Sequence, residues 1–164
     1  MTILGIDPGL ATLGWGVIRK DGHQLKPVQF GALGTQPGVA LPHRLRSIFI
    51  GIRQLMQTYE PDEIAFEELF FSKNVTTGMM VSAARGAALV AVVEKNENVF
   101  EYTPMQIKQT VAGYGKAEKR QVQQMVRMLL GLSDIPRPDD AADALAVAIT
   151  HAHTGVAASR FRMK

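Results

Sequence analysis

The chain contains no cysteine among its 164 residues. This absence excludes thiolate nucleophiles, cysteine-ligated zinc sites and disulfide frameworks, and it agrees with a reducing compartment. The sequence also lacks a continuous apolar run of about twenty residues, so we expect no membrane-spanning segment. The N-terminal stretch MTILGIDPG has neither the basic region nor the small-residue cleavage site of a signal peptide. We therefore expect a cytoplasmic protein.

Charge of one sign does not dominate either. The net charge of +3 and the pI of about 9.3 indicate an anionic partner only weakly. Charged residues are nevertheless grouped. Basic residues gather in GKAEKR (115–120) and in the terminal SRFRMK, and acidic residues gather at Asp7, Glu67, Glu68, Asp139, Asp140 and Asp143. A small acidic site inside a basic surface is the distribution that metal-assisted chemistry on a polyanion requires.

Periodicity predicts one α/β domain with a mixed sheet. Strand patterns cover 2–7, 13–20, 24–33, 63–69 and 99–103, and helical patterns cover 41–56, 75–95, 104–112, 117–129 and 139–153. Asp21 and Gly22 are a strong hairpin signal, so the first three strands should form an antiparallel meander. Thr103 and Gln106 have the spacing of a helix-capping box. We expect the domain to span residues 1–154, followed by a disordered basic tail at 155–164.

Asp140 and Asp143 begin the last helix, and their spacing places them about 60° apart on one flank of it. A local explanation exists, because the helix dipole stabilises acidic residues near a helix N-terminus. Asp139 fits that explanation as an N-cap. For the other two acids, the local and the functional explanations are equally open on these grounds. The same holds for Asp7, which precedes Pro-Gly and could be a turn residue.

The expected topology favours a shared site for these acids. Asp7 ends the first strand, Glu67 ends the fourth, and Asp140 and Asp143 begin a helix that packs on the same sheet. Functional groups in α/β sheets collect at strand ends beside helix termini. Converging carboxylates would repel one another, and divalent cations remove that repulsion. A ligand set made only of oxygen suits Mg²⁺ or Mn²⁺.

Several sequence blocks then match a known family. ILGIDPG, AFEELFF, EYTP…IKQTVAGYGKAEKRQV and DDAADALAVAITHAH closely resemble the RuvC family of Holliday-junction resolvases. The resemblance runs from the start of the chain to about His153, in the family's order and spacing. It implies an α/β protein with a ribonuclease H-like fold: a five-stranded mixed sheet, three antiparallel strands then two parallel ones, flanked by helices.

Carried over position by position, the resemblance makes Asp7, Glu67, Asp140 and Asp143 the catalytic residues and metal ligands. The implied cofactor is Mg²⁺, two ions per subunit, with Mn²⁺ able to substitute. The implied enzyme is a crossover junction endodeoxyribonuclease. It would resolve Holliday junctions by paired symmetric nicks in DNA recombination and DNA repair, and each cut would leave a 5′-phosphate and a 3′-hydroxyl.

The resemblance also implies DNA-binding residues. Phe70 matches an aromatic near the junction point, where an exposed ring can stack on an unpaired base or wedge a base step apart. The alternative is that this ring belongs to the core. Lys108 and Lys119 match basic positions near the scissile phosphate, and Lys116 and Arg120 lie in the same basic run as Lys119. For the lysines, the alternative is an ordinary solvated side chain.

The helical pattern GMMVSAARGAALVAVVEK (78–95) is apolar or small almost all round, so such a helix must be buried on more than one face. RuvC membership implies a two-fold homodimer, which would supply the second cover and two matched sites. The other implied partners are four-way junction DNA and a branch-migration helicase complex of RuvA and RuvB type, with no membrane. We interpret His23, His43, His151 and His153 as structural or surface groups, because they lack zinc-site spacing.

Two other functions fit parts of the sequence. A sugar-kinase or actin-like ATP-binding domain shares this sheet, but it needs a second domain and another phosphate loop. A non-catalytic DNA-junction-binding protein of the same fold would not need the acids, all of which are present here. Incubation with a four-way junction and Mg²⁺ separates the three functions by paired nicks, ATP turnover or binding alone.

Overall fold

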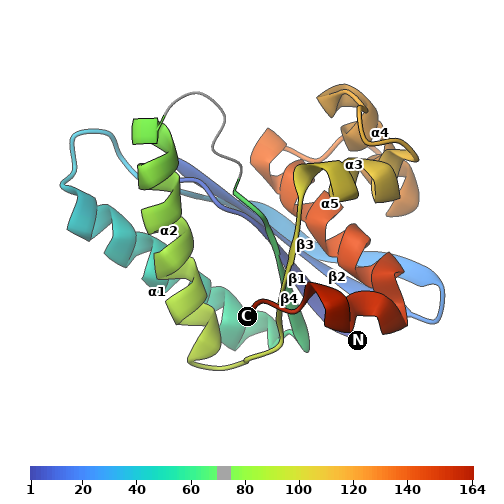
Figure 1. Ribbon diagram of the computed structural model, residues 1–164, viewed down its shortest axis with the longest axis horizontal. Helices are drawn as coiled ribbons and strands as arrows, with labels where there is room; N and C mark the ends of the chain where they lie inside the picture. Colours follow the sequence, from blue (N-terminus) through green and yellow to red (C-terminus); the bar gives the residue numbers. More distant parts are fainter. Residues whose placement is uncertain (70–74) are drawn as a thin grey trace.

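The computed structural model describes residues 1–69 and 75–164, and a mixed sheet lies at its centre (Figure 1). Within these residues, five strands lie in the order β3-β2-β1-β4-β5. They are β1 (Thr2–Asp7), β2 (Thr12–Asp21), β3 (Gln24–Gly34), β4 (Glu63–Glu67) and β5 (Val99–Tyr102). The first three pair antiparallel, whereas β4 runs parallel to both β1 and β5. This arrangement confirms the expected fold class.

The helices of the described residues are α1 (Leu41–Tyr59), α2 (Val75–Val93), α3 (Pro104–Ala112), α4 (Lys119–Leu129) and α5 (Asp139–Thr154). The predicted capping box starts α3, since the Thr103 hydroxyl accepts from the Gln106 amide and the Gln106 side chain accepts from the Thr103 amide. At α5 the prediction of an Asp139 cap is wrong. Pro138 precedes the first helical residue, and the Asp139 carboxylate pairs with Arg137 instead.

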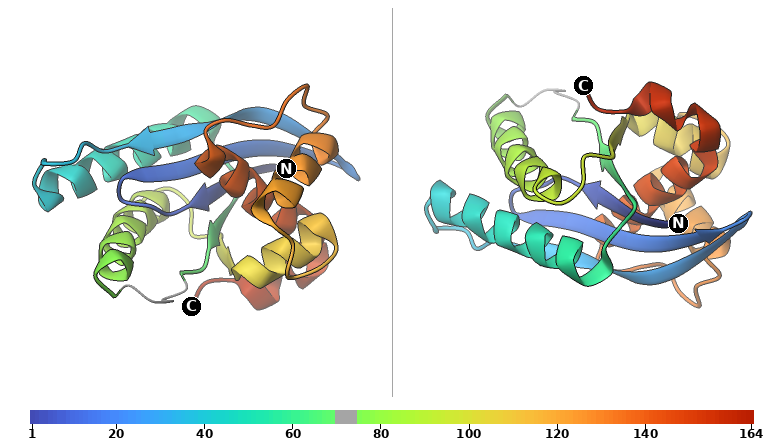
Figure 2. Two further views of the ribbon diagram at one scale, coloured as in Figure 1. Left: turned by 90° about the horizontal axis from the view of Figure 1, so that it is seen from above. Right: turned by 90° about the horizontal axis from the view of Figure 1, so that it is seen from below.

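Helices cover both faces of the sheet (Figure 1 and Figure 2). On one face, Ile6 of β1 and Phe66 of β4 are fully buried in a core that α1 and α2 complete. On the other face, Ile3 and Ala65 lie in a second core with α3, α4 and α5. Alternate residues of the two central strands therefore enter different cores, as expected for strands buried on both faces.

α5 lies close to β1 and β2 because glycines face it. A Cβ added to Gly5 would lie 2.1 Å from the carbonyl oxygen of Ala144, and one added to Gly14 would lie 2.0 Å from that of Asp140. Any side chain at either strand position would push the helix away from the sheet. The two glycines thus set the distance between the N-terminal half of α5 and the central strands.

α2 packs beside α1 but leaves a second apolar side uncovered. Met79 exposes 65% of its surface and Val90 exposes 56%. By length and composition alone, Thr76–Val93 could cross a membrane. A helix buried between protein surfaces passes the same test, and the middle of α2 carries Arg85, which is ion-paired with Glu101 at 2.7 Å.

The end of the chain packs against the sheet, which differs from the expected disordered tail. Gly155–Phe161 form a 3-10 helix, and the ring of Phe161 lies 5.0 Å from that of Tyr102, measured between centroids. The Met163 amide then donates to the carbonyl of Val99 at 2.9 Å, beside the outer strand β5. The apolar contact of Phe161 and the free edge of β5 explain why these residues are ordered. Local composition reveals neither of them.

Candidate active site

Two carboxylates meet at the ends of adjacent parallel strands. Ile6 of β1 is in register with Phe66 of β4, so the next residues, Asp7 and Glu67, leave the sheet side by side. Their carboxyl groups share a hydrogen bond. Each acid directly follows a buried apolar residue of its strand and is itself only partly buried, so it stands where the strand leaves the core.

The first turns of α5 bring two further carboxylates to this edge. Gly14 of β2 lies opposite Asp7 in the sheet, and its missing side chain admits the backbone of Asp140. Asp143 follows about one turn later. The charges of both α5 acids raise the pKa of Asp7, so the structure brings all the predicted acidic site residues into one electrostatically connected cluster. We call Asp7, Glu67, Asp140 and Asp143 the acid cluster.

The acid cluster is costly to ionise. Burial, followed by the charges of Glu67, Asp143 and Asp140, raises the pKa of Asp7 to about 8. Burial and the charge of Asp143 also raise the pKa of Glu67, although the hydrogen bond from Asp7 and the charge of Lys119 oppose that rise. The cluster therefore has an excess of negative potential that a bound cation would relieve.

A cleft of about 280 Å³ opens beside the acid cluster. Glu67, Asp143, Lys108 and Lys119 line it, each from a different element. The ammonium group of Lys119 donates to Oδ2 of Asp143 at 2.7 Å. Burial alone would lower the pKa of Lys119, but the hydrogen bond and charge of Asp143 outweigh it and raise that pKa. Acidic and ammonium groups in one cleft can receive a metal ion together with a phosphate.

The chemistry of the acid cluster fits a hard divalent cation, because every donor is a carboxylate oxygen. Across residues 1–69 and 75–164, however, no three acidic or histidine side chains are arranged to hold one ion. Asp143 is turned to Lys119, and Asp7 shares a hydrogen bond with Glu67. An ion held by these acids would therefore take the place of the proton shared by Asp7 and Glu67, and it would compete with Lys119 for Asp143. The all-carboxylate donor set favours this fit, and so does the mutual repulsion that raises the pKa of Asp7.

The other predicted DNA contacts are not part of the cleft. Lys116 and Arg120 are exposed and lie on either side of Lys119 in the chain, where α4 begins. Neither lines the cleft, so each could reach only DNA outside it. Phe70 lies outside the described residues, and its contact with an unpaired base stays a prediction.

One basic residue near the acid cluster carries no signal in the sequence. Arg44 of α1 lines a second hollow, of about 470 Å³, which also contains Asp140 and shares no lining residue with the cleft. The helical period assigns Arg44 only to the polar flank of an amphipathic helix. Its position beside the acids depends on how α1 crosses the sheet, and no local pattern reveals that crossing.

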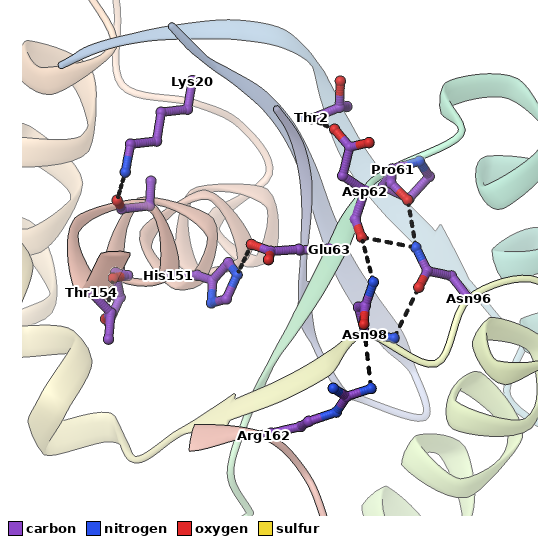
Figure 3. Close-up of polar contacts among 12 residues, drawn as sticks. Thr2, Lys20, Pro61, Asp62, Glu63, Asn96, Asn98, His151, Thr154 and Arg162 are labelled. Carbon is purple, nitrogen blue, oxygen red and sulfur yellow. Dashed lines mark hydrogen bonds and ion pairs between the residues drawn. The ribbon is translucent and has the colours of Figure 1, made fainter. Parts of the chain in front are cut away.

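His151 lies away from the acid cluster. His151 is 2% exposed, and its Nε2 lies 2.6 Å from Oε2 of Glu63, at the opposite end of β4 (Figure 3). Its Nδ1 lies 2.7 Å from the hydroxyl of Tyr102. Burial lowers the pKa of His151 against the effect of Glu63, and burial raises the pKa of Tyr102 to about 12. These are contacts of a structural histidine, in line with the interpretation made from the sequence.

Known proteins resemble this chain over nearly its whole length. The family described as crossover junction endodeoxyribonuclease RuvC matches residues 3–151, a range that contains the acid cluster. The RuvC of Alkaliphilus metalliredigens is 51% identical over 164 residues, 100% of both chains. That of Rubrobacter xylanophilus is 57% identical over 150 residues, 92% of this chain and 84% of the relative. The structure of Thermus thermophilus RuvC in complex with Holliday junction substrate superposes with a TM-score of 0.87, at 39% identity over 93% of each chain.

Proposed function

The chain belongs to the RuvC family of crossover junction endodeoxyribonucleases, and we propose that the acid cluster is its catalytic centre. The protein is an endonuclease that resolves Holliday junctions. One observation carries the proposal for the site: carboxylates from β1, β4 and α5 converge so closely that burial and mutual charge raise the pKa of Asp7 to about 8. An acidic cluster of that kind is stable and ionised only beside positive charge.

RuvC proteins are metal-dependent nucleases, and we propose that Asp7, Glu67, Asp140 and Asp143 hold two Mg²⁺ ions, which Mn²⁺ can replace. When bound, such ions activate the attacking water and stabilise the leaving oxygen of an in-line displacement. The carboxylates must be deprotonated to serve as ligands, so Asp7 gives up its proton on metal binding. This requirement makes metal affinity increase with pH.

The basic residues of the cleft position the DNA. Lys119 is held beside Asp143 by its 2.7 Å contact, and Lys108 lines the same cleft from α3. Both ammonium groups can contact the scissile phosphate, whose charge grows as the water attacks. We propose that Phe70 contacts the junction point and that Lys116 and Arg120 bind backbone phosphates outside the cleft. The expected products are a 5′-phosphate and a 3′-hydroxyl.

We extend the proposal to a two-fold homodimer. A second copy of the chain would cover the exposed side of α2, where Met79 and Val90 are in contact with solvent. Two sites related by a two-fold axis could then make paired symmetric nicks in a four-way junction. We also propose that the dimer docks on a branch-migration helicase complex of RuvA and RuvB type, and that it acts in the cytoplasm, where the junctions form.

Cleavage of a synthetic four-way junction tests the proposed catalytic centre. With Mg²⁺, the purified protein should nick two strands at symmetric positions, and a DNA ligase should reseal the nicks because the ends are a 5′-phosphate and a 3′-hydroxyl. Asp7→Asn should bind the junction normally but cleave it at least about 100-fold more slowly, a larger loss than outer-shell partners of a metal give. Binding without nicks by the wild-type protein would instead favour the non-catalytic junction-binding function.

A further inference from the structure

We propose that Arg44 and the hollow it lines bind a phosphate of the cleaved strand that neighbours the scissile one. This inference rests on the proposed role of the acid cluster and adds a DNA-binding residue that is separate from Lys108 and Lys119. Three kinds of observation carry it: the position of the hollow, the way in which Arg44 is held, and the charge that Arg44 leaves available.

The hollow adjoins the acid cluster through one shared residue. Its volume of about 470 Å³ lies within the ~300–1,000 Å³ typical of ligand clefts. Thr12, Arg44 and Thr76 are polar residues of its lining, and Asp140 belongs both to this lining and to the acid cluster. The cleft with the two lysines adjoins the cluster through Glu67 and Asp143. A DNA strand that places one phosphate at the cluster can therefore place its neighbour in the hollow.

Arg44 is held in position by a short chain of hydrogen bonds. Its Nε donates to Oγ1 of Thr35 at 2.8 Å, and that hydroxyl donates to the carbonyl of Leu10 at 2.5 Å. The Thr35 amide donates to the carbonyl of Ala11 at 2.9 Å. Leu10 and Ala11 belong to the loop that follows Asp7, so Arg44 is fixed relative to the loop that carries the first acid. A guanidinium fixed through Nε loses little further freedom when it binds an anion.

The charge of Arg44 is not neutralised by a carboxylate of the described residues. Its side chain donates to the Thr35 hydroxyl, and within residues 1–69 and 75–164 it forms no ion pair, although Asp140 lines the same hollow. Arg85 is different, because Glu101 holds its guanidinium at 2.7 Å. The terminal nitrogens of Arg44 therefore form a fork suited to a phosphate. A cation here also offsets the repulsion that the acids exert on an approaching phosphate.

The competing explanation is that Arg44 only braces the loop after Asp7. Arg44→Gln separates the two roles, because glutamine places its amide at the position of the arginine Nε. The variant can still donate to Thr35 but has lost the charged fork. Arg46→Gln is the matched control, since Arg46 is an exposed arginine of the same helix that does not line the hollow.

Single-turnover cleavage with saturating enzyme and Mg²⁺ measures the effect. The substrates are a series of four-way junctions, each of which carries a single neutral methylphosphonate at a different position flanking the cut. Wild type should lose rate about tenfold or more at one flanking position, because charge-assisted hydrogen bonds are the strong ones. Arg44→Gln should be slower by about the same factor on the unmodified junction and should lose nothing further at that one position. Arg46→Gln should remain within about twofold of wild type, and melting temperatures should confirm that both variants fold.

The proposal is overturned if Arg44→Gln cleaves the unmodified junction at the wild-type rate. It is also overturned if, at every flanking position, the methylphosphonate slows Arg44→Gln by the same factor as it slows wild type. A lowered melting temperature of Arg44→Ala together with normal cleavage by Arg44→Gln would leave only the bracing role. Failure of the underlying function looks different: wild type would make no metal-dependent nick, or Asp7→Asn would cut as fast as wild type. In that case the inference fails with the function on which it rests.

Discussion

Some residues in this protein lie where ionising their side chain costs free energy, and Asp7 is the clearest example. Its carboxyl group is largely buried, shares a hydrogen bond with Glu67 and experiences the charges of both acids on α5. Natural proteins retain such groups chiefly at functional sites, because an unpaired buried charge costs stability. The same property that makes Asp7 a metal ligand therefore makes it a source of pH-dependent instability when no cation is bound.

Metal-free protein should lose stability as the pH rises. The folded pKa of Asp7, about 8, lies above its ordinary value of 3.8, so the folded state binds this proton more tightly than the unfolded state does. The resulting stabilisation is complete below about pH 4 and is lost as the pH rises through about 8. With a chelator present, the melting temperature should fall between about pH 5 and pH 8. Mg²⁺ should restore it most at the upper end, because the ion replaces the proton.

Asp7→Asn is the control for this prediction. Its side chain has nearly the same shape but does not titrate, so the metal-free variant should melt higher than wild type near pH 8 and depend less on pH. Some dependence should remain, because burial also raises the pKa of Glu67 and Asp143. If the melting temperature of metal-free wild type increased with pH over this range, the raised pKa of Asp7 would be contradicted.

The packing of α5 against the sheet determines how close the four acids lie to one another. α5 carries Asp140 and Asp143, and it can lie close to the sheet only because Gly5 and Gly14 have no side chains. The acids themselves could be predicted from the sequence, since strand ends and a helix start are visible in the hydrophobic pattern. The depth of the helix against the sheet could not, because it depends on contacts between residues more than 100 positions apart.

Gly14→Ala should move Asp140 and Asp143 of α5 away from Asp7 and Glu67. The new methyl group would lie 2.0 Å from the backbone oxygen of Asp140, so α5 must move outward near its start. We expect a loss of about 1–3 kcal/mol in unfolding free energy, as for other overpacked sites. Cleavage should fall far more than junction binding, because small displacements of catalytic groups cost about 100-fold in rate. Denaturant unfolding and single-turnover cleavage measure the two effects.

Gly34→Ala is the matched control for that substitution. Gly34 also lies in the antiparallel part of the sheet, but nothing lies within 4 Å of a Cβ added there. Its stability and cleavage rate should remain close to those of wild type. If Gly14→Ala behaved in the same way as Gly34→Ala, the close approach of α5 would not be what holds the cluster together.

At the scale of the whole molecule, the sequence predicted only some of the surface features that the structure has. The apolar pattern of α2 predicted a helix needing two covers, and the structure supplies one of them through α1. The order of the C-terminal residues was not predicted, because the pairing of Met163 with Val99 and the ring contact of Phe161 with Tyr102 join distant positions. Arg44 was missed for the same reason. What local patterns encode was predictable, and what tertiary contacts determine was not.

Val90→Glu should convert the proposed dimer into a monomer. Val90 is 56% exposed on α2, so a carboxylate there should leave the subunit fold intact while making a buried interface unfavourable. Light scattering should give a mass near 17.9 kDa for the variant and about twice that for wild type. The variant should nick single strands of a junction without pairing the cuts. A monomeric wild type that still makes paired nicks would exclude α2 as the basis of dimer formation.

The convergence of acids from three elements on shared metal ions is tested most directly by anomalous diffraction at the manganese edge. Crystals would be grown with Mn²⁺ and an uncleavable four-way junction. We predict two anomalous peaks within about 2.0–2.3 Å of carboxylate oxygens of Asp7, Glu67, Asp140 and Asp143, beside a backbone phosphate. Manganese bound elsewhere in a protein that still cuts junctions, with these carboxylates left uncoordinated, would contradict the proposed catalytic centre.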